Sequence, residues 1–187
     1  STAYKSGGYY GLIASCMLES GFLPVTDARA QRVTRFLEEK GGLRLGLSEF
    51  GGGVDHAYTY GYWLAKLKRG EVEKAILGLY GSLAYGMARE TYSGVEVTKL
   101  FTGDNDLTLP HLYSCTQQLR LLRMLLVREE GGALWLGQAA PRPWLAAGRR
   151  IEVRDAATTH GPVSFVLEAR PDGSGVEATV DVPSRTP

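Results

Sequence analysis

Two glutamates in an aperiodic stretch of the chain are the best candidates for acid–base chemistry. Glu90 and Glu96 lie within residues 88–110, where the helical spacing of apolar residues fails for 23 residues. A connection of that length is uncommon inside a compact domain and is more often functional. Because a carboxylate can act as a general acid or base, we expect Glu96 to be the catalytic carboxylate and Glu90 the alternative. A solvated loop glutamate is the competing interpretation of each.

A segment rich in glycine and aromatic residues is the best candidate for a sugar-binding surface. Residues 51–63 read GGGVDHAYTYGYW. Glycines let the backbone approach a ligand closely, and aromatic faces can stack on sugar rings. We expect four side chains of this segment to contact substrate: Asp55, His56, Tyr60 and Trp63. The alternatives are a helix cap for Asp55, a satisfied helix-start residue for His56, and packing between helices for the aromatic rings.

Three further features complete the candidate site. His111 directly follows Pro110 at the predicted start of a helix, where the helix dipole favours a neutral imidazole that could bind a hydroxyl group. Arg89 is an additional candidate substrate contact. The segment SGGYYG at residues 6–11 repeats the glycine and aromatic theme. It could line the same opening or simply begin a helix.

Composition and motifs argue against several other classes of function. The chain has 187 residues, with 21 Lys and Arg against 20 Asp and Glu, so nothing indicates a nucleic-acid partner. No apolar run approaches the roughly 18 to 20 residues that span a bilayer, and no signal peptide is apparent, which predicts a soluble chain of unassigned compartment without a membrane partner. No phosphate-binding glycine motif, serine elbow or metal-ligand spacing is present, so we expect no cofactor and no metal. Cys16 and Cys115 are expected to be buried free thiols.

Apolar periodicity predicts helices first and strands afterwards. Helices are expected over 10–20, 28–40, 55–67, 71–87 and 111–128. After Gly131 and Gly132 the pattern shortens and alternates, which predicts strands over 133–136, 150–154, 162–169 and 176–182. This order indicates an α-then-β fold class, with helical residues 1–130 followed by a β module of residues 131–187.

The β-rich end carries a resemblance to a known family. The runs LWLG at 134–137, RPWL at 142–145 and TTHGPVS at 158–164, together with residues 151–153, resemble the C-terminal end of bacterial proteins of the six-hairpin, or (α/α)6, glycosidase superfamily. The resemblance implies a partial toroid of antiparallel helix pairs followed by a small antiparallel β-sandwich-like module. It also implies a carboxylate such as Glu96 on a loop before a final helix that opens near a histidine, here His111.

That resemblance sets the expected function and partners. Five helices are fewer than the twelve of such a toroid, so the chain is expected to be the closing part of a longer carbohydrate-active enzyme. Its partners would be a carbohydrate substrate and either the N-terminal remainder of the protein or a second copy. Hydrolysis of a glycosidic bond with Glu96 as base is the leading hypothesis. A polysaccharide lyase that uses a Tyr or His base, and a noncatalytic glycan-binding or structural module, are the alternatives.

Overall fold

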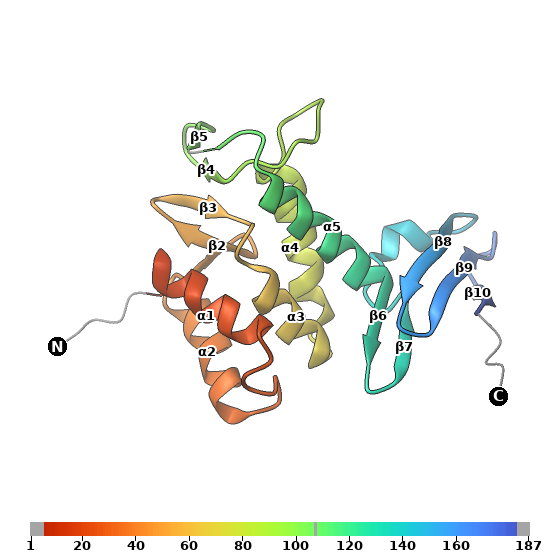
Figure 1. Cartoon of the computed structure of the whole chain (residues 1–187). Helices are drawn as coiled ribbons and strands as arrows, with labels where there is room; N and C mark the ends of the chain where they lie inside the picture. The colour runs from red at the N-terminus through yellow and green to blue at the C-terminus, as the bar shows by residue number, and fades with distance from the viewer. Residues whose placement is uncertain (1–5, 107, 183–187) are drawn as a thin grey trace. The chain divides into compact units, whose positions relative to one another are not determined.

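A computed structural model gives the fold and describes residues 6–106 and 108–182 (Figure 1). Contacts divide the chain into two compact units, Ser1–Leu122 and Arg123–Pro187. This division falls near the predicted change of character after residue 130. The candidate site lies entirely within the first unit.

The helices follow much of the predicted periodicity. They are α1 (Tyr9–Glu19), α2 (Ala28–Glu39), α3 (Tyr60–Lys68), α4 (Val72–Tyr85) and α5 (Leu112–Leu126). Asp27 caps α2 as expected, because its side-chain Oδ1 accepts a hydrogen bond from the backbone N–H of Arg29 at 2.7 Å. The helix predicted from residue 55 instead begins at Tyr60, because Asp55 belongs to a strand.

Five short strands lie between and beside these helices. They are β1 (Leu43–Arg44), β2 (Leu47–Phe50), β3 (Gly53–Asp55), β4 (Val97–Lys99) and β5 (Asn105–Asp106). The strands form one antiparallel sheet in the order β1-β2-β3-β4-β5. The aperiodic segment between α4 and α5 therefore does not run as an open connector, since it adds the last two strands to a sheet begun more than 40 residues earlier.

The expected partial (α/α)6 toroid is wrong. Across residues 6–106 and 108–182 the helices form no inner and outer ring, and strands are present in both units. The physical reason is that the glycine-dense residues 41–53 and the segment before α5 form strands. These strands pair with each other in one sheet. A toroid would need short turns between antiparallel helices at these places.

The second unit is built from hairpins. The end of α5 leads into β6 (Val127–Glu130), which pairs with β7 (Ala133–Leu136) through a turn whose two glycines, Gly131 and Gly132, both have positive φ. A 3-10 turn (Arg142–Leu145) precedes β8 (Arg150–Thr158), β9 (Gly161–Ala169) and β10 (Val176–Asp181), which form a three-stranded sheet. Four of these strands, β7 to β10, occupy the predicted strand regions.

Close packing between α1 and α3 holds the elements that carry the candidate site. A Cβ placed on Gly61 would lie 1.9 Å from the backbone oxygen of Ser15, so only glycine allows the two helices to approach this closely. The backbone N–H of Tyr62 also donates to the Ser15 hydroxyl at 3.2 Å. Trp63, fully buried, donates from its indole N–H to the carbonyl of Gly46 at 2.7 Å and ties α3 to the turn between β1 and β2.

We expect Gly61→Ala to destabilise the first unit by about 1–3 kcal/mol, because the added methyl group must push α1 away from α3. The measurement is the midpoint of thermal or urea unfolding. Gly175→Ala is the control, since a Cβ there meets no atom within 4 Å. Equal stability of the two variants would contradict the close-packing role of Gly61.

Candidate functional site

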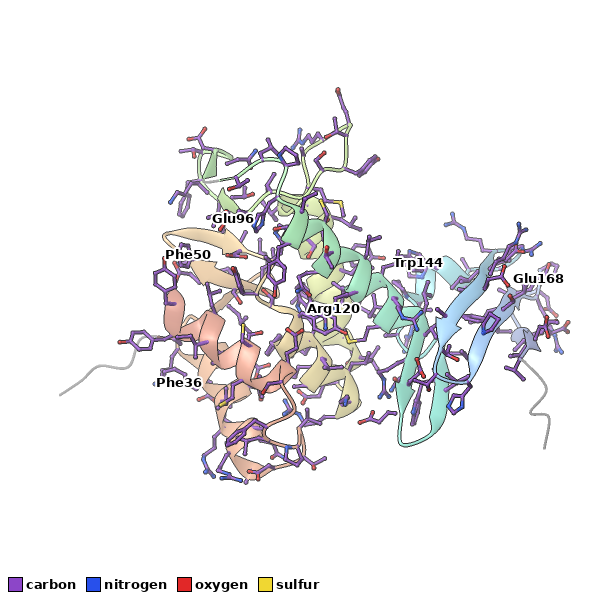
Figure 2. The ribbon with its side chains drawn as sticks, in the orientation of Figure 1. Phe36, Phe50, Glu96, Arg120, Trp144 and Glu168 are labelled. Carbon is purple, nitrogen blue, oxygen red and sulfur yellow. The ribbon has the colours of Figure 1, made fainter. Side chains whose placement is uncertain are left out.

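Strand pairing brings the two candidate carboxylates together. Asp55, the last residue of β3, pairs with Val97, the first residue of β4. Glu96 directly precedes Val97 and therefore lies beside Asp55, although 40 residues separate them in the sequence. Figure 2 labels Glu96 and also Phe50, the last residue of β2, which pairs with Gly53 at the other end of β3 from Asp55.

The start of α5 is held against the same segment. The backbone N–H of His111 donates to the carbonyl of Gly94 at 2.8 Å. A Cβ on Gly94 would lie 2.8 Å from the backbone nitrogen of Cys115, so glycine is needed for this approach. As a result the Nε2 atom of His111 lies 3.9 Å from Oε2 of Glu96. Its Nδ1 atom is 2.6 Å from the hydroxyl of buried Ser114, which fixes the ring orientation.

Asp55 and Glu96 line one cavity of about 470 Å³, a volume within the usual range for small-molecule sites. The remaining lining residues come from α1, from the end of β2 and from the turn before α3: Tyr9, Leu12, Ile13, Cys16, Phe50 and Tyr58. The rings of Tyr9 and Phe50 meet edge to face at 5.1 Å between centroids. Asp55 is 2% exposed and Tyr9 is 72% exposed, so the carboxyl group lies at the floor of the cavity and the phenol at its rim.

The electrostatic environment of Asp55 differs from that of an ordinary surface carboxylate. Burial and, to a smaller extent, the negative charge of Glu96 raise the pKa of Asp55 to about 7. Hydrogen bonds from the backbone N–H groups of Ala57, at 2.8 Å, and of Tyr58 act in the opposite direction but do not restore the usual value. Near neutral pH the Asp55 carboxyl group is therefore protonated in a large fraction of molecules.

His56 lies in the core behind this floor and not in the cavity lining. Burial, together with the nearby charge of His111, lowers the pKa of His56 to about 4. Its imidazole is therefore neutral at physiological pH. The side chain of His56 packs against Gly86, where an added Cβ would come within 2.7 Å of Nδ1.

The other predicted site residues lie outside the cavity lining. Trp63 is fully buried in the core, and Tyr60 is buried with the guanidinium of Arg120 3.9 Å from its ring centroid. Arg89 and Glu90 are exposed on the turn between α4 and β4, where Glu90 has a φ of 71°. The structure thus brings Asp55, Glu96 and His111 together and does not bring these four residues to them.

Several lining residues were not predicted from the sequence. Phe50 is the last residue of β2 and directly precedes Gly51 and Gly52. Neither Phe50 nor the α1 residues Leu12 and Ile13 have a residue type or spacing that indicates a site. Cys16 is exposed and Cys115 is half-buried, and both are free thiols, so the expectation of two buried cysteines is wrong. The glycine and aromatic run at residues 6–11 did point to Tyr9.

Other features of the described residues bear on the possible chemistry. No group of three or more His, Cys, Asp or Glu within 6–106 and 108–182 is arranged to hold a metal ion. In those same ranges no helix is both long and apolar enough to cross a bilayer. Comparison of the chain with protein-family models, with curated proteins and with solved structures finds no match.

Proposed function

We propose that this protein hydrolyses a glycosidic bond in the cavity that contains Asp55 and Glu96. The observation that carries the proposal is the pairing of two carboxyl groups in one cavity, of which one has its pKa raised to about 7 by burial. Glycosidases use such a pair, a protonated acid and an ionised partner. The aromatic lining, on which a sugar ring can stack, also supports it.

In the proposed reaction Asp55 acts as general acid and Glu96 as general base. Asp55 gives its proton to the glycosidic oxygen as the bond from that oxygen to the anomeric carbon breaks. Water supplies a hydroxyl group to the anomeric carbon, and its remaining proton passes to Glu96. A proton then returns from Glu96 to Asp55 through solvent, which restores both groups. His111 faces Glu96, with its Nε2 atom 3.9 Å from Oε2 of the base.

Two observations favour hydrolysis over β-elimination. No lysine or arginine is among the described residues that line the cavity, so no fixed positive charge is available there for the carboxylate of a uronate. Burial and the charge of Asp55 raise the pKa of Tyr58, which makes its phenol a poor proton acceptor. A lyase that used Tyr58 as its base would need the pKa of that phenol to be lowered.

Product analysis tests the proposal. The purified chain is incubated with a panel of aryl glycosides and oligosaccharides, and both released reducing ends and absorbance near 235 nm are recorded. We expect new reducing ends without the absorbance of an unsaturated uronate. Absorbance growing with cleavage would establish a lyase instead. Saturable binding of glycans without any cleavage would establish a binding module.

A further inference from the structure

We propose that the cavity prefers sugars that carry a protonated amine next to the anomeric carbon, such as glucosaminides, over uncharged sugars and uronates. The inference rests on the proposed function, because it names the substrate class of the same cavity. It comes from the combination of aromatic rings and carboxyl groups in a single cavity.

Aromatic rings form part of the cavity wall. Three rings, those of Tyr9, Phe50 and Tyr58, line the cavity. Their orientations are supported by ring contacts, between Tyr9 and Phe50 at 5.1 Å and between Tyr58 and Tyr113 at 5.2 Å. The negative face of an aromatic ring attracts an ammonium group, and walls of several rings are a recurrent way to bind organic cations.

The charged groups at the cavity leave it with carboxyl groups and no lysine or arginine in the part of its lining that the structure describes. Glu96 and Asp55 are the lining carboxyl groups, and neighbouring cations are engaged elsewhere. The Lys99 ammonium donates to the carbonyl of Gly51 at 2.7 Å, and Arg120 pairs with Glu19 at 2.6 Å. His111 is the titratable group that faces Glu96 from α5, at 3.9 Å, too long for a direct hydrogen bond. A ligand cation would therefore complete the charge balance of the cavity.

The two carboxyl groups differ in how deeply they are buried. Asp55 lies at the floor and is 2% exposed, whereas the side chain of Glu96 is 21% exposed and therefore more accessible to a ligand. In a 2-amino sugar the amine is bonded to the carbon next to the anomeric carbon. A carboxylate placed to act at the anomeric carbon therefore also lies close to the ammonium group. Glu96 can serve both purposes while Asp55 addresses the leaving oxygen.

Binding measured by calorimetry on the intact chain tests the inference. The probes are methyl glucosaminide, methyl N-acetylglucosaminide, methyl glucoside and methyl glucuronide, at about pH 6, where an amine is protonated. We expect the glucosaminide to bind about tenfold more tightly than the glucoside, and the glucuronide to bind more weakly than both. Added salt should reduce the preference for the amine.

A matched pair of variants assigns the preference to the cavity. Glu96→Gln should reduce the preference for the amine to within about twofold. Glu90→Gln, the same change on the exposed turn outside the cavity, should keep it. Bound glucosaminide should also slow alkylation of Cys16, which lines the cavity, while Cys115, outside the lining, reacts at its usual rate and serves as an internal reference.

The outcomes separate this inference from the proposed function. Equal binding of all four probes, or tightest binding of the glucuronide or the acetylated sugar, would overturn the amine preference while leaving hydrolysis of another glycoside intact. A clear preference for glucosaminide in a protein that cleaves no glycoside would overturn the hydrolytic function and leave the amine-binding site standing.

Discussion

Glu96→Gln is expected to lower kcat/KM for glycoside hydrolysis by about 10³-fold or more, the usual loss when a catalytic base is removed. The amide keeps the shape and size of the side chain but cannot accept a proton from water. Because Glu96 is partly exposed, the change should leave folding intact. Initial rates of reducing-end release on the most reactive glycoside of the panel provide the measurement.

Glu90→Gln is the matched control for that experiment. Glu90 is a glutamate on the same connection between α4 and α5, but it is exposed on a turn and does not line the cavity. Its replacement should leave kcat/KM within about twofold of the unmodified protein. Full activity of the Glu96 variant, or equal losses in both variants, would remove Glu96 from the reaction.

Asp55→Asn should abolish hydrolysis and at the same time stabilise the fold at alkaline pH. The pKa of Asp55 rises from 3.8 to about 7 on folding, so the folded state holds a proton that the unfolded chain has lost. The stabilising effect of that proton is complete below about pH 4 and is lost as pH rises through about 7, on the order of 4 kcal/mol in total. Asparagine carries no charge and avoids this loss, while its side-chain oxygen can still accept the N–H of Ala57.

Protonation of His56 has the opposite effect on folding stability. The Asp55→Asn variant therefore reveals the contribution of His56. Its pKa falls from 6.5 to about 4 on folding, so stability is lost as pH falls from about 6.5 towards 4. In the unmodified protein the pH dependence of stability that arises from Asp55 opposes the one that arises from His56. In Asp55→Asn the His56 slope should remain alone, and stability should rise from pH 4 to about 6.5 and then level off.

Urea unfolding of both proteins between about pH 4 and pH 8 measures these slopes. At about pH 8 the inactive variant should be the more stable of the two by several kcal/mol. If the variant is instead less stable at that pH, or shows the same pH slope as the unmodified protein, then Asp55 is not a buried, protonated acid.

The sequence predicted local structure better than it predicted pairing. Helical periodicity located α1, α2, α4 and α5 because each has an apolar stripe, although the helix predicted to residue 128 ends at Leu126, where β6 begins. The strands β1 to β5 have two to four residues each, too few to establish an alternating pattern. The sheet they form, which excludes a toroid, depends on pairing between residues far apart in the chain.

The candidate site shows the same difference between local structure, which the sequence predicts, and long-range pairing, which it does not. Glu96 and His111 were identified from their chemistry and their place around an aperiodic segment, and the structure brings them within 3.9 Å. Asp55 was predicted to contact substrate, but its proposed role as an acid depends on burial and on the nearness of Glu96, which the pairing of β3 with β4 produces. Trp63 was assigned to the sugar site by residue type alone, yet Gly78 leaves room for its ring in the core.

Carboxyl-carbon NMR titration of Asp55, in the unmodified protein and in Glu96→Gln, tests the paired acid and base most directly. We expect a midpoint near 7 in the unmodified protein and a lower midpoint, still above 3.8, once the charge of Glu96 is removed and burial remains. A midpoint near 3.8 in the unmodified protein, or one that does not respond to the Glu96 change, would contradict the proposed pairing.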